Sequence, residues 1–569
     1  MRSYWMRSLL IAIALMTGEQ LRSQEKAIID ETFIEDFWLF PGHARSFITA
    51  IDKTVTPAGS LALFKTITHP TTDVALLQQR QALVQQFAAA QPLLREVREQ
   101  LQVIVPMHDL VLQYCQWSNA ATKEFENCYF KQKHLRRFNT NPVALNASVA
   151  LLYTSLSLPL LVHLGQHLVL EGLLKRRCHH HHEENAAHGA SNVILRALEN
   201  KFIRTAVHWG VHAPSLIAMG QLMQNTATSI DHIARQVRQM AAFITIAQQL
   251  GIRLRGNKAL ADIAALQPLV TLQPASWDGL VGRLIALQRR SMWQVITWGE
   301  MLALHQQLRM QYQAVEQLAQ ALAALDLHSS LAWMVTQDTT WSYATYIERQ
   351  QPLIQCVALT HPQVMASSHS NCCMGHDLSL GETVARHAIV TGANAAGKST
   401  FMTSVMTAAL LAQSIGIVPA KKWVMTPFAK LISYIRVASD ITTGKSLFQV
   451  ELARVAHITQ QLENLVSTGH ALLGIDEAFF QSTQAATGTK LAIDFLQHLA
   501  VHTNALSLTV THNQMLTILE QWQANLFVNL VARCDYAHDG KKVYVVDRGV
   551  FGTQEDPLRT VRHAKDFAA

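Results

Sequence analysis

The sequence has few of the residues that interrupt helices, with 25 glycines and 15 prolines among 569 residues. This content is far below a collagen-like or low-complexity composition and favours long helices. Charged residues make up only 15% of the chain and hydrophobic residues 49%, so it can bury large cores and is not globally disordered. The 7 cysteines are scattered and odd in number, which argues against a secreted disulfide scaffold and favours a reducing compartment.

The length predicts about three to four domains at roughly 150 residues each. Acidic residues are fewer than basic ones, 40 against 47, which gives a net charge of +7. This balance is compatible with an anionic partner such as nucleic acid but does not establish one.

Two regions could meet a membrane. Residues 1–16 place a basic start before a short apolar run, as signal peptides do, but no small-x-small cleavage site follows. We therefore favour an amphipathic or buried first helix over a signal-like segment.

Residues 147–174 and 206–219 are apolar, and the first stretch is long enough to span a bilayer, although polar side chains interrupt it. We favour buried helices in a cytoplasmic protein; the alternative is association with the inner membrane through these two segments.

The character of the sequence changes near residue 351. Before it, the chain reads mostly as helix, because apolar residues recur every three or four positions in Val74 to Ala90, Leu93 to Val105 and Met301 to Leu325. After it, short β-rich runs alternate with helical segments, which predicts an α/β domain with a mainly parallel sheet. Asp539-Gly540 between two alternating apolar segments predicts a hairpin.

The strongest local pattern is a glycine-rich loop between a predicted strand and a predicted helix. Residues 392–399 read Gly-Ala-Asn-Ala-Ala-Gly-Lys-Ser and follow the apolar run 388–391. Such a loop wraps phosphates with backbone N–H groups at a helix N-terminus. Lys398 is expected to reach the β- and γ-phosphates, and Ser399 to bind Mg²⁺. The pattern therefore predicts a site for the phosphates of a nucleotide and Mg²⁺.

Two later strand ends supply candidate catalytic residues. Residues 471–475 form an apolar run that ends in Asp476-Glu477. A carboxylate at the end of a neighbouring parallel strand can hold Mg²⁺, so Asp476 is assigned to the metal and Glu477 to the general base. The apolar run 506–510 is followed by Thr511 and His512, and His512 is expected to sense the γ-phosphate.

A further anion-binding turn is predicted where residues 440–448 lead into a helix over Gln449 to Glu463. Gly444 and Ser446 precede this helix and can offer backbone and hydroxyl donors to an anion. A plain helix-capping turn is the alternative.

Taken together, these motifs resemble the ATPase domain of the MutS family, which is related to ABC ATPases. Residues 391–400 match the family loop T-G-x-N-x-x-G-K-S-T, including Asn394. The family signature, a glycine followed by S-x-F-x-x-E, is matched by Gly444, Ser446, Phe448 and Glu451, and the L-S-G-G-Q motif of ABC transporters is absent from the sequence. The nucleotide-binding residues that the loop and the resemblance indicate are Gly392, Asn394, Gly397, Lys398, Ser399, Thr400, Gly444 and Ser446.

The resemblance extends upstream, where residues 52–61, Pro70 and Arg80-Gln81 are similar to the opening of the family's helical lever domain. It implies an α plus α/β fold in three parts. These are an N-terminal segment at 1–44, a long-helix core or lever domain at 45–350 with a clamp or membrane hairpin near 145–225, and an ABC-type P-loop ATPase domain at 351–569.

Only about forty residues precede the lever, so the family's mismatch-reading and connector domains are not expected. Phe33-Ile34-Glu35 spells the Phe-x-Glu of mismatch readers, and without a surrounding domain we interpret it as coincidence.

The family relationship implies an ATP hydrolase that acts as a homodimer or heterodimer. Ser446 of one subunit would complete the ATP site of the other, and the levers would hold double-stranded DNA through its phosphates. The alternative is a membrane-tethered mechanical or scaffold ATPase that does not bind DNA. A non-hydrolysing binding protein is disfavoured because Lys398, Ser399, Asp476 and Glu477 are all present.

Overall fold

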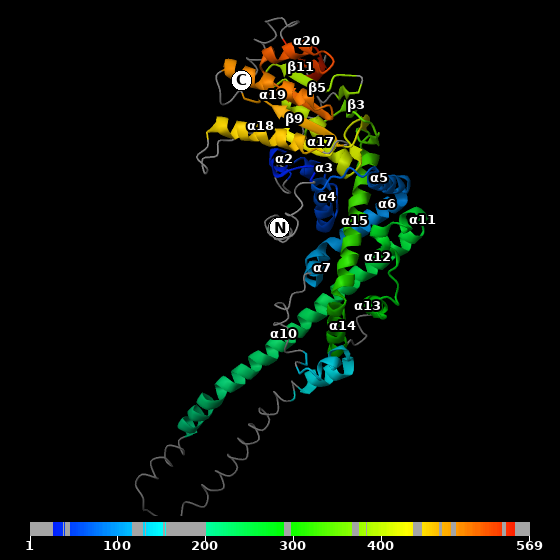
Figure 1. The fold of residues 1–569 in the computed structure, drawn as a ribbon. Helices are drawn as coiled ribbons and strands as arrows, with labels where there is room; N and C mark the ends of the chain where they lie inside the picture. The colour runs from blue at the N-terminus through cyan, green and yellow to red at the C-terminus, as the bar shows by residue number, and fades with distance from the viewer. Residues whose placement is uncertain are drawn as a thin grey trace, which may run out of the picture. The chain divides into compact units, whose positions relative to one another are not determined.

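The structure is a computed structural model, drawn in Figure 1. It describes residues 27–37, 39, 46–115, 129–130, 132–151, 154, 201–289, 297–366, 375–382, 384–435, 446–465, 469–479, 485–536 and 542–551. The chain forms two compact units, one made of Met1–Gln102 with Ala323–Ala569 and the other of Val103–Leu322. The domain boundaries expected after residues 44 and 350 stay predictions.

The first unit is built around a six-stranded sheet with the strand order β12-β11-β5-β10-β9-β8. Its strands are β5 (His387–Gly392), β8 (Lys430–Tyr434), β9 (Ala471–Asp476), β10 (Ala505–Val510), β11 (Phe527–Tyr536) and β12 (Lys542–Arg548). All neighbouring pairs are parallel except β11 and β12. The mainly parallel sheet is therefore confirmed. The antiparallel β11–β12 pair is the one expected around Asp539-Gly540, two residues that lie outside the described ranges.

Helices cover both faces of this sheet (Figure 1). Helix α17 (Lys398–Ser414) packs on β5, β9 and β10, whereas α18 (Leu447–Glu463) and α19 (Ala485–Val501) share an apolar cluster with β8 and β9. Residues of β9 alternate between the two layers: Leu473 faces the cluster, and a Cβ on Gly474 would lie 3.0 Å from Cγ of Met406 in α17. Because a covered parallel sheet has two buried faces, β5 and β10 are buried at every residue.

Two smaller sheets belong to the same unit. One has the order β2-β7-β3-β4, with β2 (Thr345–Tyr346), β7 (Lys422–Met425), β3 (Leu353–Leu359) and β4 (His376–Gly381). The other pairs β1 (Ser342–Tyr343) with β6 (Ile417–Val418). Short helices α16 (Pro362–Ala366) and α20 (Ile518–Trp522) and the 3-10 turn η7 (Gln514–Thr517) complete this part.

Helices from the start of the chain also belong to the first unit. They are α2 (Glu31–Asp36), α3 (Phe47–Ile51), α4 (Pro57–Thr68), α5 (Val74–Ala89) and most of α6 (Gln91–Ile104), together with the part of α15 (Tyr312–Gln337) that follows Leu322. Phe33 of α2 is fully buried and stacks on Phe37 with ring centroids 4.4 Å apart. It is a core residue and not a base-stacking one, which confirms the interpretation of the Phe-x-Glu as coincidence.

A buried carboxylate explains the motif at residues 52–61. Asp326 of α15 accepts hydrogen bonds from the N–H of Val55 at 3.0 Å and from the N–H and hydroxyl of Thr56, each at 2.6 Å. These bonds hold the start of α4. A Cβ on Gly59 would lie 2.2 Å from an Asp326 carboxylate oxygen, so glycine is needed for this approach.

The second unit is helical in its described residues. Its elements are η2 (Val105–Met107), α7 (His108–Cys115), η4 (Arg136–Thr140), α10 (Lys201–Arg255), α11 (Lys258–Ala261), η5 (Ala264–Leu266), α12 (Gln267–Val270), α13 (Leu280–Arg289) and α14 (Trp298–Met310). Helix α10 runs for 55 residues and packs on α12, α13 and α14. His305 of α14 is fully buried and hydrogen-bonded to the Tyr129 hydroxyl at 2.7 Å. Burial lowers the pKa of His305 to about 3, so the ring is neutral at physiological pH.

The helices expected at Val74 to Ala90 and Leu93 to Val105 are confirmed as α5 and α6. The helical reading of Met301 to Leu325 is also confirmed, and the stretch is divided between α14, which ends at Met310, and α15, which begins at Tyr312. Gln311 leaves the helical region with ψ at 23°, and its N–H bonds to both Gln307 and Leu308 carbonyls. The apolar pattern continues across this break, so periodicity does not reveal it.

The membrane alternative finds no support in the described residues. Residues 206–219 lie inside the continuous helix α10 and do not form a separate span. Among the described helices, none combines the length and the apolar character needed to cross a bilayer. Most of the other stretch, residues 155–174, lies outside the described ranges.

Candidate nucleotide site

Three parallel strands end at one edge of the large sheet and bring the predicted residues together. Strand β5 ends at Gly392, β9 ends at Asp476, and His512 follows the end of β10. The sheet order places β10 between β5 and β9, so the expectation that Asp476 lies on the strand next to the loop strand is wrong. The three ends still converge because the strands are parallel and in register, with Val510 of β10 opposite both Val390 and Asp476.

The glycine-rich loop turns sharply from β5 into α17. The φ angles of Gly392, Ala395 and Gly397 are 153°, 60° and 89°, which is the region that glycine adopts most easily. A Cβ on Gly392 would lie 2.3 Å from the Ala532 carbonyl oxygen of β11, so a side chain is excluded there. Gly397 is the N-cap of α17, and no side chain caps this helix start. The first-turn N–H groups and the helix dipole therefore favour an anion at this position.

Lys398 points its ammonium group into the loop and toward the end of β10. Its Nζ donates to the Gly392 and Ala393 carbonyls at 3.0 and 2.9 Å and lies 3.2 Å from Nε2 of His512. Burial lowers the pKa of Lys398, while the carboxylates of Glu477 and Asp476 act in the opposite direction. The loop thus presents one cation beside two acidic residues.

Ser399 and Asp476 lie close enough for their side chains to form a hydrogen bond. Burial raises the pKa of Asp476, opposed by this hydrogen bond and by Lys398. A hydroxyl and a carboxylate at one point are ligands that suit Mg²⁺, which keeps several waters and needs few protein ligands. The donor set of these two residues therefore fits a magnesium ion.

Glu477 occupies an unusual backbone conformation directly after β9. Its φ is 54°, a left-handed value that costs a residue other than glycine of order 1 kcal/mol. Its Oε1 accepts a hydrogen bond from the backbone N–H of His512 at 2.9 Å and lies 3.8 Å from Nε2 of the same residue. Burial raises the pKa of Glu477, with a further upward contribution from Asp476. A carboxylate held this way is suited to accept a proton.

His512 is half-exposed, with 48% of its side-chain surface accessible. Burial and the neighbouring Lys398 ammonium lower its pKa, so its ring is neutral at physiological pH. Asn394 and Thr400 are exposed on the loop and at the start of α17.

The predicted turn before α18 is only partly described. Gly444 lies outside the described residues, and Ser446 is the N-cap of α18. The Ser446 hydroxyl accepts from the Gln449 N–H at 3.3 Å, and the Gln449 side chain accepts from the Ser446 N–H at 3.0 Å, which makes a capping box. Within the described part of the chain, no hydrogen bond joins Ser446 to residues 392–400 of the same chain.

One residue beside the loop was missed by the sequence reasoning. The Tyr544 ring of β12 would lie 3.2 Å from a Cβ placed on Gly397. It therefore packs against the loop and restricts position 397 to a small residue. Its place depends on the pairing of β12 with β11, and the sequence around Tyr544 carries no motif that indicates this contact.

Family models match both parts of the chain. The model described as MutS domain III matches residues 29–332, and the model described as MutS domain V matches residues 388–551.

The chain belongs to the MutS family.

Its similarity to curated relatives is partial. It is 29% identical over 212 residues to the DNA mismatch repair protein MutS of Leuconostoc mesenteroides, covering 37% of this chain and 24% of that protein. It is 28% identical over 228 residues to MutS of Desulfitobacterium hafniense, covering 40% and 25%. It is 34% identical over 137 residues to the DNA mismatch repair protein MSH6 of Saccharomyces cerevisiae, covering 24% and 10%. The chain thus spans about a quarter or less of the length of these relatives.

Proposed function

We propose that this MutS-family chain is a Mg²⁺-dependent ATP hydrolase that couples ATP binding and hydrolysis to lever movement and DNA binding. The observation that carries the proposal is the convergence of two groups of residues at one sheet edge. Lys398 and Ser399 come from the glycine-rich loop, and Asp476, Glu477 and His512 come from the ends of two other strands. The partial similarity to DNA mismatch repair proteins supports the same class of activity.

In this proposal the loop binds the phosphates and the strand ends carry out the chemistry. The uncapped N–H groups of α17 and the ammonium of Lys398 would bind the β- and γ-phosphates. Ser399 and Asp476 would hold magnesium, whose charge would neutralise the phosphate oxygens. Glu477 would orient and deprotonate the attacking water, and the neutral ring of His512 would donate a hydrogen bond to the γ-phosphate.

Ser446 is proposed to act on the nucleotide of a second subunit. Its hydrogen bonds join it to its own helix, and its exposed position at the start of α18 leaves it open to a partner. A homodimer or heterodimer would then have composite sites, with Ser446 and Gly444 of one chain facing the loop of the other. ATP would favour the closed state by its greater affinity for that state.

The C-terminal end of α17 contacts helix α5, and these contacts support a coupling between the nucleotide site and the helices that precede the sheet in the sequence. The side chain of Gln81 in α5 donates to the Ala344 and Gly416 carbonyls, both at 2.7 Å, and Arg80 donates to the Ser414 carbonyl. The N–H of Thr71 donates to the Gln413 carbonyl at 2.8 Å. Because α17 begins at the phosphate loop and ends at these contacts, a shift of the helix on ATP binding would reach α5 directly.

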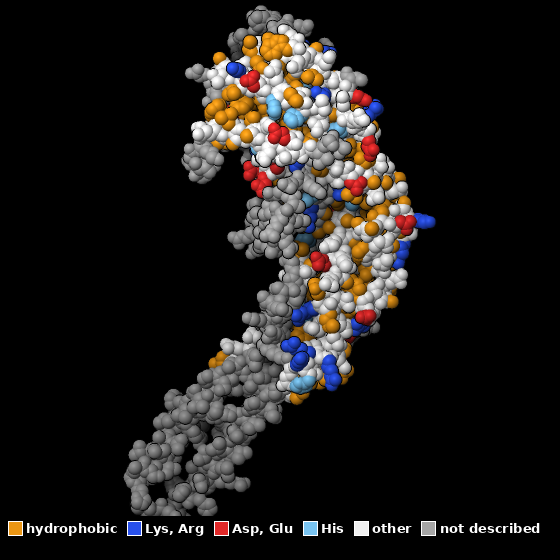
Figure 2. Space-filling model, in the orientation of Figure 1, with side chains coloured by type: hydrophobic (Ala, Val, Ile, Leu, Met, Phe, Trp, Pro, Cys, Tyr) orange, Lys and Arg blue, Asp and Glu red, His pale blue; other side chains and the backbone are white. Residues whose placement is uncertain are grey.

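DNA binding is proposed to use phosphate contacts without mismatch recognition by this chain. The net charge of +7 favours an anionic partner. On the face shown in Figure 2, Lys and Arg side chains occupy several separate places. Exposed basic residues of the second unit include Arg136, Arg137, Arg235 and Arg238. We place this activity in the cytoplasm, as the scattered cysteines also favour.

Two measurements test the proposal. Phosphate release from Mg²⁺-ATP is expected for the natural chain and should be lost in Lys398→Ala, whereas Asp231→Asn on the exposed surface of α10 should leave it unchanged. Binding of homoduplex, mismatched and branched DNA, with and without ATP and across a salt series, should weaken steadily as salt rises. Absence of phosphate release would overturn the ATPase, and salt-insensitive or absent binding to every DNA would overturn the DNA part alone.

A further inference from the structure

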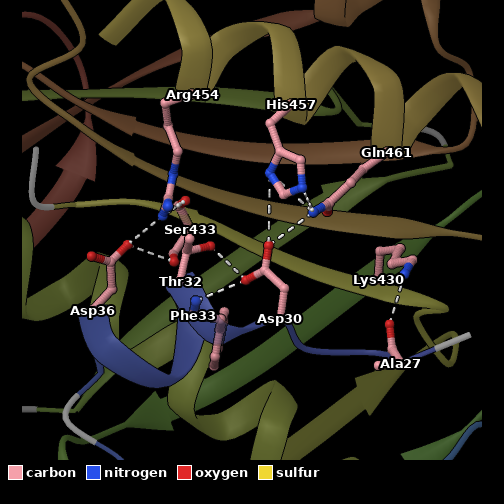
Figure 3. Close-up of polar contacts among 10 residues, drawn as sticks. All are labelled: Ala27, Asp30, Thr32, Phe33, Asp36, Lys430, Ser433, Arg454, His457 and Gln461. Atoms are coloured by element: carbon pink, nitrogen blue, oxygen red, sulfur yellow. Dashed lines mark hydrogen bonds and ion pairs between the residues drawn. The ribbon is translucent and has the colours of Figure 1, made fainter. Parts of the chain in front are cut away.

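The described N-terminal residues form a separate polar and apolar contact with the ATPase sheet. Residues 27–37, which we call the N-terminal wedge, lie against β8 and α18 (Figure 3). The Leu431 N–H of β8 donates to the Ile28 carbonyl at 2.8 Å, and Lys430 Nζ donates to the Ala27 carbonyl at 2.7 Å. The wedge therefore bonds to the outer edge of the last strand of the sheet.

Asp36 joins this wedge to both the sheet and α18. Its Oδ2 accepts from the Ser433 hydroxyl at 2.7 Å and from Nη2 of Arg454 at 2.9 Å (Figure 3). The same Arg454 nitrogen donates to the Ser433 carbonyl at 2.8 Å. The side chains of Arg454 and Asp36 are only 14% and 5% exposed, so water screens this ion pair little.

A second carboxylate of the wedge holds α18 further along the helix. Asp30 accepts from the Gln461 side chain at 2.8 Å, and His457 lies 3.9 Å from the same carboxylate oxygen. The other oxygen accepts from the Phe33 N–H at 2.8 Å and thereby caps α2. Residues of two turns of α18 thus bond to the wedge, while Ile458 and Leu462 pack into the core beneath.

We propose that Asp36 is a positioning residue for ATP hydrolysis, because through Arg454 it sets the place of α18 and therefore of Ser446. Arg454 follows Ser446 by eight residues on one uninterrupted helix, so a shift at Arg454 carries the helix start with it. This inference rests on the proposed function, in which Ser446 acts on the nucleotide of the partner subunit. It assigns to the wedge a role in the partner's site and none in the phosphate loop of its own chain.

The Asp36→Asn variant keeps the side-chain volume and removes the charge that Arg454 faces. Affinity for a fluorescent ATP analogue should stay within about twofold, because the loop of the same chain is intact. The kcat for phosphate release should fall by tenfold or more, since misplacing a reacting group by about 1 Å costs on the order of a hundredfold. Asp231→Asn makes the same chemical change in an exposed ion pair of α10 and should leave both values unchanged.

Mixed dimers separate action on the partner from damage to the variant's own chain. A dimer of one Asp36→Asn chain with one Lys398→Ala chain, purified through two different tags, has one intact loop facing one correctly placed α18. Its rate should recover to about half that of the natural dimer. Placing both substitutions on one chain, paired with a natural chain, leaves the only intact loop facing the misplaced α18 and should stay slow.

The reverse order of rates would overturn the proposal, because Asp36 would then act within its own chain. Equal rates in the two mixed dimers would overturn it as well, because Asp36 would then act on neither site in particular. If Asp36→Asn does not fold, Arg454→Lys replaces it, since lysine keeps the charge but cannot reproduce the geometry of the guanidinium bonds. A natural protein that releases no phosphate or forms no dimer would instead contradict the proposed function, and the same experiment records both properties.

Discussion

Two clusters of charged side chains lie on the same parallel sheet and differ in how completely they are satisfied. In the nucleotide site the side chains of His512 and Glu477 are 48% and 22% exposed, and Asp476 and Glu477 both have pKa values raised by burial. Where the N-terminal wedge meets α18, the side chains of Arg454 and Asp36 are 14% and 5% exposed and hydrogen-bonded to each other and to β8. The first cluster holds charge that a bound cation and phosphates would balance, whereas the second is balanced by the protein itself.

This difference indicates that the first cluster is arranged to bind a ligand, whereas the second stabilises the folded chain. Unbalanced carboxylates raise the free energy of the folded state, as the left-handed φ of Glu477 also does. Such groups therefore favour ligand binding and not stability. The same Asp-to-Asn substitution should thus leave stability unchanged in the nucleotide site and lower it in the wedge.

The largest effect is expected for Asp476→Asn in the nucleotide site. Loss of a magnesium ligand should lower phosphate release by about a hundredfold or more. Thermal unfolding without nucleotide should not be lowered, because burial raises the pKa of Asp476 and disfavours its charged form near neutral pH. Phosphate release and the midpoint of thermal unfolding, measured on the same sample, test these two expectations. A fall of several degrees in the midpoint would contradict the expected difference in stability between the nucleotide site and the wedge.

The next effect is expected for Asp36→Asn in the wedge, where stability should fall by about 3 kcal/mol because Arg454 is left buried without its partner. Hydrogen exchange of β8 and α18 amides should then become faster by about a hundredfold. Combining Asp36→Asn with Arg454→Met should cost less than the sum of the two single changes. Additive costs would contradict a coupled ion pair.

A moderate effect is expected for Gln81→Met in α5. Two buried carbonyls, of Ala344 and Gly416, lose their donor, which should cost about 2 kcal/mol. Phosphate release without DNA should persist, and its response to DNA should weaken, because the contact between α5 and the end of α17 is lost. Gln78→Met on the exposed face of the same helix is the control and should change neither property. An unaltered DNA response in Gln81→Met would contradict transmission through this contact.

The smallest effect is expected for Asp30→Asn, and it should depend on pH. Burial alone would raise the pKa of Asp30, but hydrogen bonds from Thr32, Phe33 and Gln461 lower it below 3.8. The stabilisation by its charge is therefore fully present above pH 3.8 and is lost as pH falls through the lowered pKa. Urea unfolding should show a deficit of about 1 kcal/mol at pH 7 that shrinks as the pH falls below 3.8 and through the lowered pKa. A loss of unfolding free energy in Asp30→Asn that grows as the pH falls would contradict a lowered pKa of Asp30.

The residues of the nucleotide site could be predicted from the sequence because they lie in one short motif or at the ends of apolar strands. Lys398 and Ser399 belong to one contiguous motif, and Asp476, Glu477 and His512 each lie at the end of an apolar strand, so chemistry and chain order indicate them. Their geometry was less predictable, because the position of β10 between β5 and β9 depends on pairing that no local pattern encodes.

The contacts outside the nucleotide site join residues far apart in the chain. Asp36 and Arg454 are separated by 418 positions, and Gln81 and Gly416 by 335. No local pattern joins the two members of either pair, so only the folded chain identifies each residue's partner. The break between α14 and α15 has no signal in the sequence for a different reason, because the apolar period continues across it while the backbone of Gln311 ends the helix.

The most direct test of the central claim compares ATP binding and phosphate release in the natural chain and in Glu477→Gln. Glutamine keeps the size of the side chain but cannot accept the proton of the attacking water. The proposal predicts that Glu477→Gln binds Mg²⁺-ATP as tightly as the natural chain and releases phosphate at least about a thousandfold more slowly. Phosphate release at the natural rate in Glu477→Gln would contradict the assignment of this sheet edge as the site of hydrolysis.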